Sequence, residues 1–243
     1  MNKDKTLLIN TRGLKLLADS NLLKEFAVFL YLKSLYSNSC IFNYTQSSLA
    51  AKSKLPLSSI KSNVKLFIDS GWCRMHRGNL IFNKVKEFCH TKRITRKRIA
   101  ITNPKQILDD LYKLILEHAE DKFKILTKIS ADLLSSHPKI RRSAEKKADR
   151  LNLDINKLPG ASDLISLSMK KISQLLGVSV GKAASIIKRF KTDGSIWCVT
   201  ERKVITDPWI KWKPKTWLEY NTGHYYHNGM LFKVCCNKYK FNK

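Results

Sequence analysis

The chain repeats a pattern of apolar residues, helix caps and glycines, and this repeat constrains the fold more than any other feature of the sequence. The two copies align without a gap at an offset of 123 residues. An internal repeat indicates that one supersecondary unit occurs twice. The matching pairs are Thr45 and Ser168, Leu49 and Ile172, Leu55 and Val178, Ser62 and Ser185, Val64 and Ile187, Lys65 and Lys188, Phe67 and Phe190, and Gly71 and Gly194.

Each copy predicts a short extended segment followed by two helices joined by a turn. The extended segments are residues 40–44 and 164–167, and Thr45 and Ser168 are the predicted N-caps. Apolar residues at helical spacing predict the buried face of each second helix, and glycine ends that helix. These apolar residues are Ile60, Val64, Phe67 and Ile68 in the first copy, and Ala183, Ile186, Ile187 and Phe190 in the second.

A hairpin is predicted after each glycine. In the first copy, residues 72–75 and 80–83 flank a turn at 76–79, and in the second, 195–200 pairs with 203–206 around Glu201 and Arg202. A helix rich in leucine and phenylalanine, residues 22–35, precedes the first copy. Asn103-Pro104 predicts the start of another helix, with a break near Glu120 and Asp121.

Helix, turn, helix and two-stranded wing together resemble the winged helix-turn-helix family. In each copy the resemblance rests on the pattern T/S-x3-L/I-x5-L/V followed by I/A-x3-V/I-x2-F-x3-G. It implies a mainly α fold with small β-wings, with two winged units joined by a basic helical connector. The expected regions are winged unit one (13–88), the connector (89–160), winged unit two (161–208) and an aromatic, basic hairpin region (209–243).

The resemblance also implies that the second helix of each copy enters the DNA major groove and that the wing reaches the backbone. The side chains expected to make these contacts are equally consistent with an ordinary solvated surface. The expected contacts are Ser58, Ser59, Lys61, Ser62 and Lys65 in the first copy, Lys182, Ser185, Lys188 and Arg189 in the second, and Arg74, Arg77, Arg202 and Lys203 in the wings.

The net charge of +27 indicates a polyanionic partner, for which we expect double-stranded DNA. Two further basic segments are candidates for phosphate contacts, although such runs also occur as solvated linkers. Their residues in this prediction are Arg93, Arg96, Lys97 and Arg98, and Arg141 and Arg142. No apolar run spans a membrane, so we expect a cytoplasmic, nucleoid-associated protein without a membrane partner.

The C-terminal region interleaves tryptophan and tyrosine with lysine between Trp209 and Tyr226, and Asn228-Gly229 predicts a tight hairpin. These aromatic residues either stack on unpaired bases or pack in a core or a subunit contact, and the second interpretation is favoured. His224, His227, Cys235 and Cys236 have poor spacing for zinc. We therefore expect no metal site, and the six cysteines are expected to be reduced.

Motifs for phosphate loops, dinucleotide binding, metalloproteases and serine hydrolases are missing from the sequence. The prediction is a DNA-binding protein that is not an enzyme, needs no cofactor and takes no small-molecule substrate. It would act in replication initiation or transcription regulation of a phage or plasmid, with a homodimer left open. The alternatives are nonspecific RNA binding or DNA packaging, a nuclease or recombinase with a dispersed site, and a protein-interaction adaptor.

Overall fold

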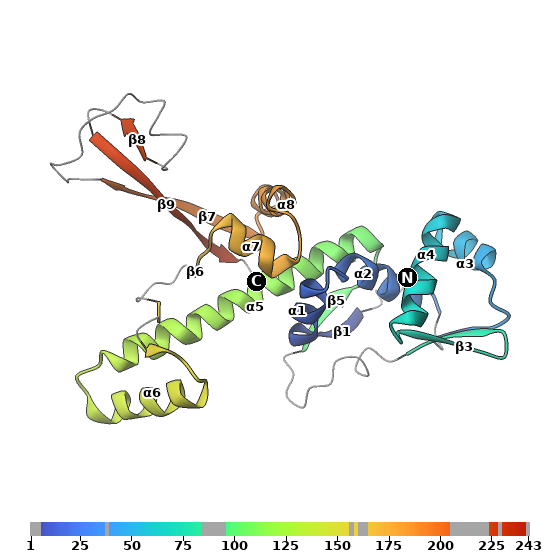
Figure 1. Ribbon diagram of the computed structural model, residues 1–243, viewed down its shortest axis with the longest axis horizontal. Helices are drawn as coiled ribbons and strands as arrows, with labels where there is room; N and C mark the ends of the chain where they lie inside the picture. The colour runs from blue at the N-terminus through green and yellow to red at the C-terminus, as the bar shows by residue number, and fades with distance from the viewer. Residues whose placement is uncertain are drawn as a thin grey trace. The chain divides into compact units, whose positions relative to one another are not determined.

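The computed structural model describes residues 6–36, 39–83, 96–155, 158–159, 165–204, 224–227 and 230–241. It is mainly helical with small antiparallel sheets, in agreement with that part of the prediction (Figure 1). Contacts divide the chain into two compact units. Unit 1 comprises Met1–His118 with Gln174–Ser179, and unit 2 comprises Ala119–Ser173 with Val180–Lys243.

Unit 1 contains the first copy of the repeat and the strands and helices that surround it. Helix α5 begins in this unit and continues into unit 2. The elements are β1 (Thr6–Asn10), α1 (Thr11–Asp19), α2 (Leu23–Ser34), β2 (Cys40–Ile41), α3 (Gln46–Ser53), α4 (Leu57–Asp69), β3 (Cys73–His76), β4 (Asn79–Phe82), β5 (Arg96–Ala100) and α5 (Pro104–Leu133).

Strands β2, β3 and β4 form a three-stranded antiparallel sheet in the order β2-β4-β3, so the last strand lies in the middle. The predicted hairpin is confirmed, because His76 pairs with Asn79 across a two-residue turn. Arg77 and Gly78 in that turn both have positive φ, 47° and 74°. Two positive φ values are typical of the tight turn whose twist matches that of a hairpin.

The core of unit 1 is built around aromatic rings from α2, α4 and the small sheet. Phe29 is fully buried, and its ring makes edge-on contacts with three others. The centre of the Phe29 ring lies 5.5 Å from the ring centre of Phe67, 5.6 Å from that of Trp72 and 5.7 Å from that of Phe82. Edge-to-face packing at these separations is favourable beyond the area it buries. The aromatic cluster thus holds the α3–α4 pair and its hairpin on α2.

A second, two-stranded sheet in unit 1 pairs β1 with β5 and was not predicted. Asn10 pairs with Arg96 and Thr6 with Ala100, while Ile9 and Ile99 are buried. The strands lie far apart in sequence, so no local turn signal announces their pairing. Arg96, Lys97 and Arg98, which were predicted to contact phosphate, therefore lie in strand β5.

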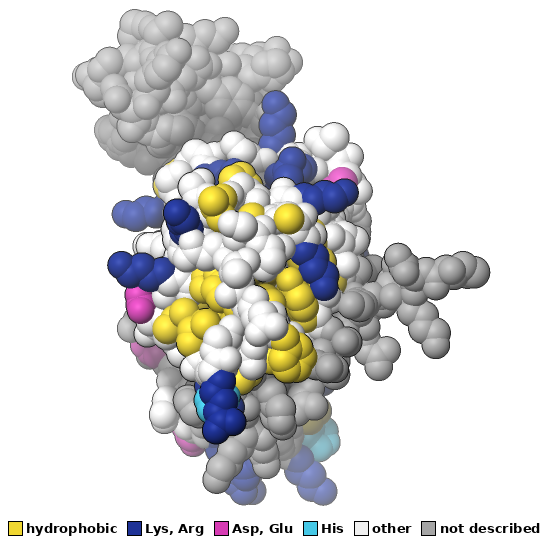
Figure 2. Space-filling view, turned by 90° about the vertical axis from the view of Figure 1, so that its right-hand side faces the viewer, with side chains coloured by type: hydrophobic (Ala, Val, Ile, Leu, Met, Phe, Trp, Pro, Cys, Tyr) yellow, Lys and Arg dark blue, Asp and Glu magenta, His cyan; other side chains and the backbone are white. Residues whose placement is uncertain are grey.

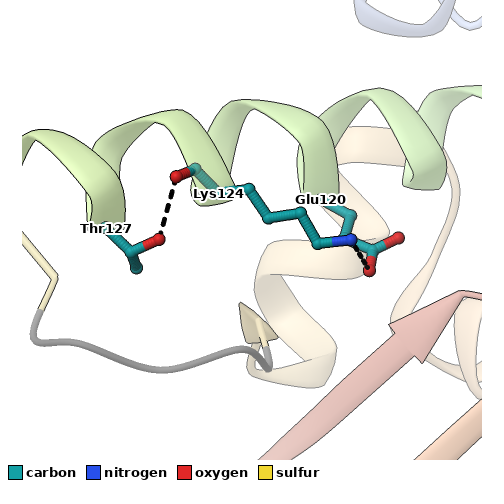
Figure 3. Close-up of polar contacts among 3 residues, drawn as sticks. All are labelled: Glu120, Lys124 and Thr127. Carbon is teal, nitrogen blue, oxygen red and sulfur yellow. Dashed lines mark hydrogen bonds and ion pairs between the residues drawn. The ribbon is translucent and has the colours of Figure 1, made fainter.

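Helix α5 is continuous, and the predicted break near Glu120 and Asp121 is wrong. Its predicted start is confirmed by Asn103, whose Oδ1 accepts a hydrogen bond from the Gln106 amide at 2.9 Å. Glu120 is fully buried, yet its carboxylate lies 2.9 Å from the Lys124 ammonium one turn along the same helix (Figure 3). This i,i+4 pairing within α5 partly offsets the buried charge, although neither carboxylate oxygen of Glu120 has a hydrogen-bond partner.

Unit 2 contains most of the second copy and a basic helix that precedes it. On α6, Ala144 and Ala148 are buried and the basic side chains are exposed. Besides the C-terminal part of α5, the elements are α6 (Pro138–Arg150), β6 (Ile165–Ser166), α7 (Met169–Leu176), α8 (Val180–Thr192), β7 (Ile196–Val204), β8 (His224–His227) and β9 (Met230–Phe241), although residues 174–176 at the end of α7 are assigned to unit 1.

The sheet of unit 2 has the order β6-β9-β7, with β8 also paired to β9. The predicted hairpin around Glu201 and Arg202 is wrong, because β7 passes through both residues and pairs with β9 from the C-terminal region (Figure 1). Glu-Arg lacks the glycine or asparagine that a tight turn requires. The hairpin predicted at Asn228-Gly229 is confirmed by the pairing of His227 with Met230.

The buried face predicted for the second helix of this copy is confirmed, since Ala183, Ile186, Ile187 and Phe190 are all buried. Tyr239 of β9 is completely buried and its hydroxyl accepts a hydrogen bond from the Asn237 side chain at 3.2 Å. The C-terminal strand therefore supplies part of this core. None of the helices in the described ranges is long and apolar enough to cross a bilayer.

Candidate nucleic-acid interface

The α3–α4 pair is fixed locally by a cap and a tight turn. Thr45 Oγ1 accepts a hydrogen bond from the Ser48 amide at 3.1 Å, which confirms the predicted N-cap. Lys54 has a left-handed conformation, with φ 56°, and ends α3. Helix α4 then begins after Pro56, a residue that disfavours helical continuation from the one before it. This geometry fixes the direction in which α4 leaves α3.

One face of α4 is buried through Ile60, Val64 and Phe67, as the sequence predicts. Ile68, predicted on the same face, is 38% exposed, so that part of the prediction is wrong. At 100° per residue, Ile68 lies about 80° away from Ile60 around the helix axis, at the edge of the buried face. The remaining surface of α4 is open to solvent.

The predicted contact residues of α4 lie mostly on its solvent-exposed surface. Ser58, Lys61, Ser62 and Lys65 are exposed, whereas Ser59 is half-buried. Ser62 Oγ donates a hydrogen bond to the Ser59 carbonyl at 3.1 Å, so this hydroxyl keeps an oxygen that can still accept. The two ammonium groups therefore dominate what α4 offers to a partner.

The α7–α8 pair repeats this arrangement in the second copy. Ser168 Oγ accepts a hydrogen bond from the Lys171 amide at 3.2 Å, which confirms the second predicted N-cap. Lys182, Ser185 and Lys188 of α8 are exposed. Arg189 is half-buried, with its guanidinium carbon 5.8 Å from the centre of the Phe190 ring. Arg189 thus lies against the core rather than fully in solvent.

The wing residues predicted for the two copies lie in different settings. Arg74 on β3 and Arg77 in the β3–β4 turn are exposed. Arg202 and Lys203 lie within β7, where the register pairs them with Val234 and Lys233, and their side chains fall outside the described part of the structure. The second copy therefore presents a long strand pair where a short hairpin was expected.

The two basic segments are described only in part. Arg93 lies outside the described residues, and for Arg96, Lys97 and Arg98 the structure gives only the backbone of β5. Arg141 and Arg142 are both exposed on α6, and Arg141 Nε lies 3.2 Å from the Glu145 carboxylate. Exposed ion pairs of this kind are weak. Both arginines therefore remain accessible to phosphate.

The charge pattern of the two second helices suits a polyanion. Helix α8 carries no acidic residue, and α4 carries one, Asp69 at its last position. Lysines of equivalent register, Lys65 and Lys188, are exposed on both. Several ammonium groups held on rigid helices attract a phosphate backbone and release its condensed counterions.

An apolar concavity beside α4 was not anticipated from the sequence. It has a volume of about 310 Å³ and lies between α4, β3 and the start of α3. It is lined by Tyr44, Gln46, Lys61, Val64, Lys65, Ile68, Asp69 and Met75. Figure 2 looks onto this end of unit 1 and shows hydrophobic side chains gathered in the middle of the face, with lysine and arginine around them.

The spacing of residues along α4 contained a signal for this concavity. Leu57, Lys61, Lys65 and Ile68 recur every three or four residues, which places them along one flank of a helix. Ile68 was expected on the buried face and Leu57 in the turn before the helix. Both are partly exposed, at 38% and 41%, and Ile68 lines the concavity. An apolar flank bordered by lysine suits a binding partner that carries both negative charge and apolar groups.

The described residues hold no group of three or more histidine, cysteine and acidic side chains that could bind a metal ion. The side chains of His224, His227, Cys235 and Cys236 lie outside that part of the structure. No protein-family model, curated protein or solved structure matches this chain.

Proposed function

We propose that the chain is a non-catalytic protein that binds duplex DNA through two winged helix-turn-helix units. The observation that supports this most strongly is that one connectivity occurs twice. Strand, helix, helix and strand follow one another in both copies, with sheet orders β2-β4-β3 and β6-β9-β7. The central strand comes directly after β3 in the first copy, whereas β8 lies between β7 and β9 in the second. In this proposal the first winged unit consists of α2, β2, α3, α4, β3 and β4. The second consists of β6, α7, α8, β7 and β9.

The exposed charges explain how such units would bind. The major groove of B-DNA, about 12 Å wide, admits one α-helix. Helices α4 and α8 each bury an apolar face and expose lysines, Lys61 and Lys65 on one and Lys182 and Lys188 on the other. Each helix would lie in the groove with its lysines near phosphates and base edges. Arg77 at the tip of the first hairpin would reach the adjacent backbone.

The biological role belongs to the same proposal and rests on the resemblance. Two winged units in one chain are the arrangement by which replication initiators of phages and plasmids grip repeated sites. A transcription regulator would use the same surface. Both roles need recognition of particular sequences, which sets them apart from DNA packaging or general RNA binding.

The test is selection of bound duplexes from a random pool at physiological salt. We expect an enriched motif, and we expect Lys65→Ala and Lys188→Ala each to weaken binding to it roughly five- to tenfold, the loss of one charge-assisted contact. Lys24→Ala on α2 and Lys128→Ala on α5 are matched controls, because both are exposed lysines outside the proposed surface.

Two results would contradict the proposal. Binding without any enriched motif, together with a steep dependence on salt, would indicate nonspecific attachment to nucleic acid. Equal losses in Lys24→Ala and Lys65→Ala would show that overall charge, and not α4, determines affinity.

A further inference from the structure

The concavity beside α4 combines apolar walls with cationic residues. Ile68 and Met75 are 38% and 46% exposed, although both are large hydrophobic side chains. The rest of the lining consists of Tyr44, Gln46, Lys61, Val64, Lys65 and Asp69, so two lysines and one carboxylate lie beside the apolar side chains. Exposed apolar surface costs free energy in water, so a surface of this kind is explained by a partner that covers it.

Apart from Asp69 at its last position, the exposed polar side chains of α4 are lysine and serine, which lack a planar pair of hydrogen-bonding groups. The helix contains no arginine, whose planar fork is the usual reader of guanine. Asn63 could read adenine, but it is half-buried and its amide nitrogen donates to the Ser59 carbonyl at 2.7 Å. Gln46 and Asp69 also line the concavity, but most of its exposed lining is apolar.

Thymine is the base that offers a complementary apolar group. Its 5-methyl group projects into the major groove, and side chains recognise it by apolar contact. The lysines that line the same concavity supply attraction to the flanking phosphates. A duplex rich in A·T pairs therefore matches both the apolar and the charged parts of this surface.

We infer that the concavity formed by Ile68, Met75 and Tyr44 receives thymine methyl groups and gives the first winged unit a preference for A·T-rich duplex DNA. This inference rests on the proposed function and specifies the base chemistry that α4 reads. It assigns specificity to residues that the charge pattern alone would not single out.

The test compares thymine with uracil, which differs only by lacking that methyl group. A duplex enriched from the random pool is synthesised twice, with thymine or with uracil at every T position. We expect the wild-type protein to bind the thymine duplex about fourfold more tightly for each methyl group buried, the factor for removing one such group from water. We expect Ile68→Ala and Met75→Ala to lower this ratio towards one.

Phe42→Ala is the matched control, because Phe42 is 68% exposed in the same unit and is not part of the concavity lining. This variant should keep the wild-type ratio. The inference is overturned if the wild-type protein binds both duplexes equally, or if Ile68→Ala and Met75→Ala keep the ratio. Duplex binding would persist in both cases and the proposed function would stand, whereas failure to bind any duplex would remove both.

Discussion

Cys73 begins strand β3 and is almost completely buried, with 2% of its surface exposed. Burial raises the pKa of its thiol to about 12, against a smaller lowering by Lys33. Burial also raises the pKa of the nearby Tyr44 hydroxyl, to which a thiolate at Cys73 would add repulsion. Desolvation penalises the charged form of both groups, so each stays neutral in the native protein over a wide pH range.

The raised pKa predicts a loss of stability in alkaline solution. Well below pH 9 the thiol is neutral in both the native and the unfolded state, so it contributes no pH dependence. Between its ordinary pKa of 9.0 and the native value of about 12, only the unfolded protein ionises, which favours unfolding. We expect the wild-type advantage over Cys73→Ala in free energy of unfolding to shrink by about 1.4 kcal/mol per pH unit in that window. Denaturant titrations at several pH values measure this difference, and a constant difference would contradict the burial of Cys73.

The two helix pairs share their caps as well as their order. Thr45 and Ser168 each accept a hydrogen bond from the third residue of the following helix, at 3.1 and 3.2 Å. Gly71 and Gly194, with φ of 70° and 74°, follow α4 and α8 in the left-handed conformation that ends a helix. Equivalent local interactions thus define both ends of the repeated unit.

This equivalence predicts matched effects of removing the caps. Thr45→Ala and Ser168→Ala should each lower the free energy of unfolding by about 1 kcal/mol, because each leaves one helix amide without its acceptor. Denaturant unfolding followed by circular dichroism measures both. Thr45→Ser and Ser168→Thr retain the hydroxyl and should remain within a few tenths of a kcal/mol of the wild type. An alanine variant as stable as its hydroxyl-bearing counterpart would contradict the cap at that position.

The elements that sequence reasoning predicted best are those defined by local signals. Helices α3 and α4 correspond to α7 and α8 at the same offset of 123 residues, at both ends of each helix. Helix caps, apolar periodicity and helix-ending glycines each involve residues close together in the chain, so the sequence alone is enough to recognise them. The hairpins around residues 76–79 and at Asn228-Gly229 were predicted for the same reason.

Pairings between distant segments could not be predicted in this way. Strand β7 pairs with β9, and β1 with β5, across long stretches of sequence. Such pairings depend on tertiary packing, as the burial of Ile9, Ile99 and Tyr239 illustrates. The lysines of α4 and α8 are exposed, as predicted from the repeat. The apolar concavity at Ile68 and Met75 could not be predicted, because it forms only where α4 lies beside β3 in the folded protein.

At the scale of the whole molecule, the net charge of +27 is distributed over both units. Lysines on α4 and α8 are exposed, and so are Arg141 and Arg142 on α6. A protein with many such groups should lose affinity for DNA steeply as salt rises, because each phosphate contact releases condensed counterions. The net charge does not predict how many separate DNA segments the protein contacts. The duplicated connectivity predicts that each winged unit contacts its own segment of the duplex.

Hydroxyl-radical footprinting on the selected duplex tests this central claim most directly. We expect the wild-type protein to protect two separate segments of the backbone. Lys65→Ala should weaken protection of one segment and Lys188→Ala that of the other, at protein concentrations where Lys24→Ala leaves both intact. A single protected segment, or the loss of the same segment in both variants, would contradict the account of two DNA-binding units.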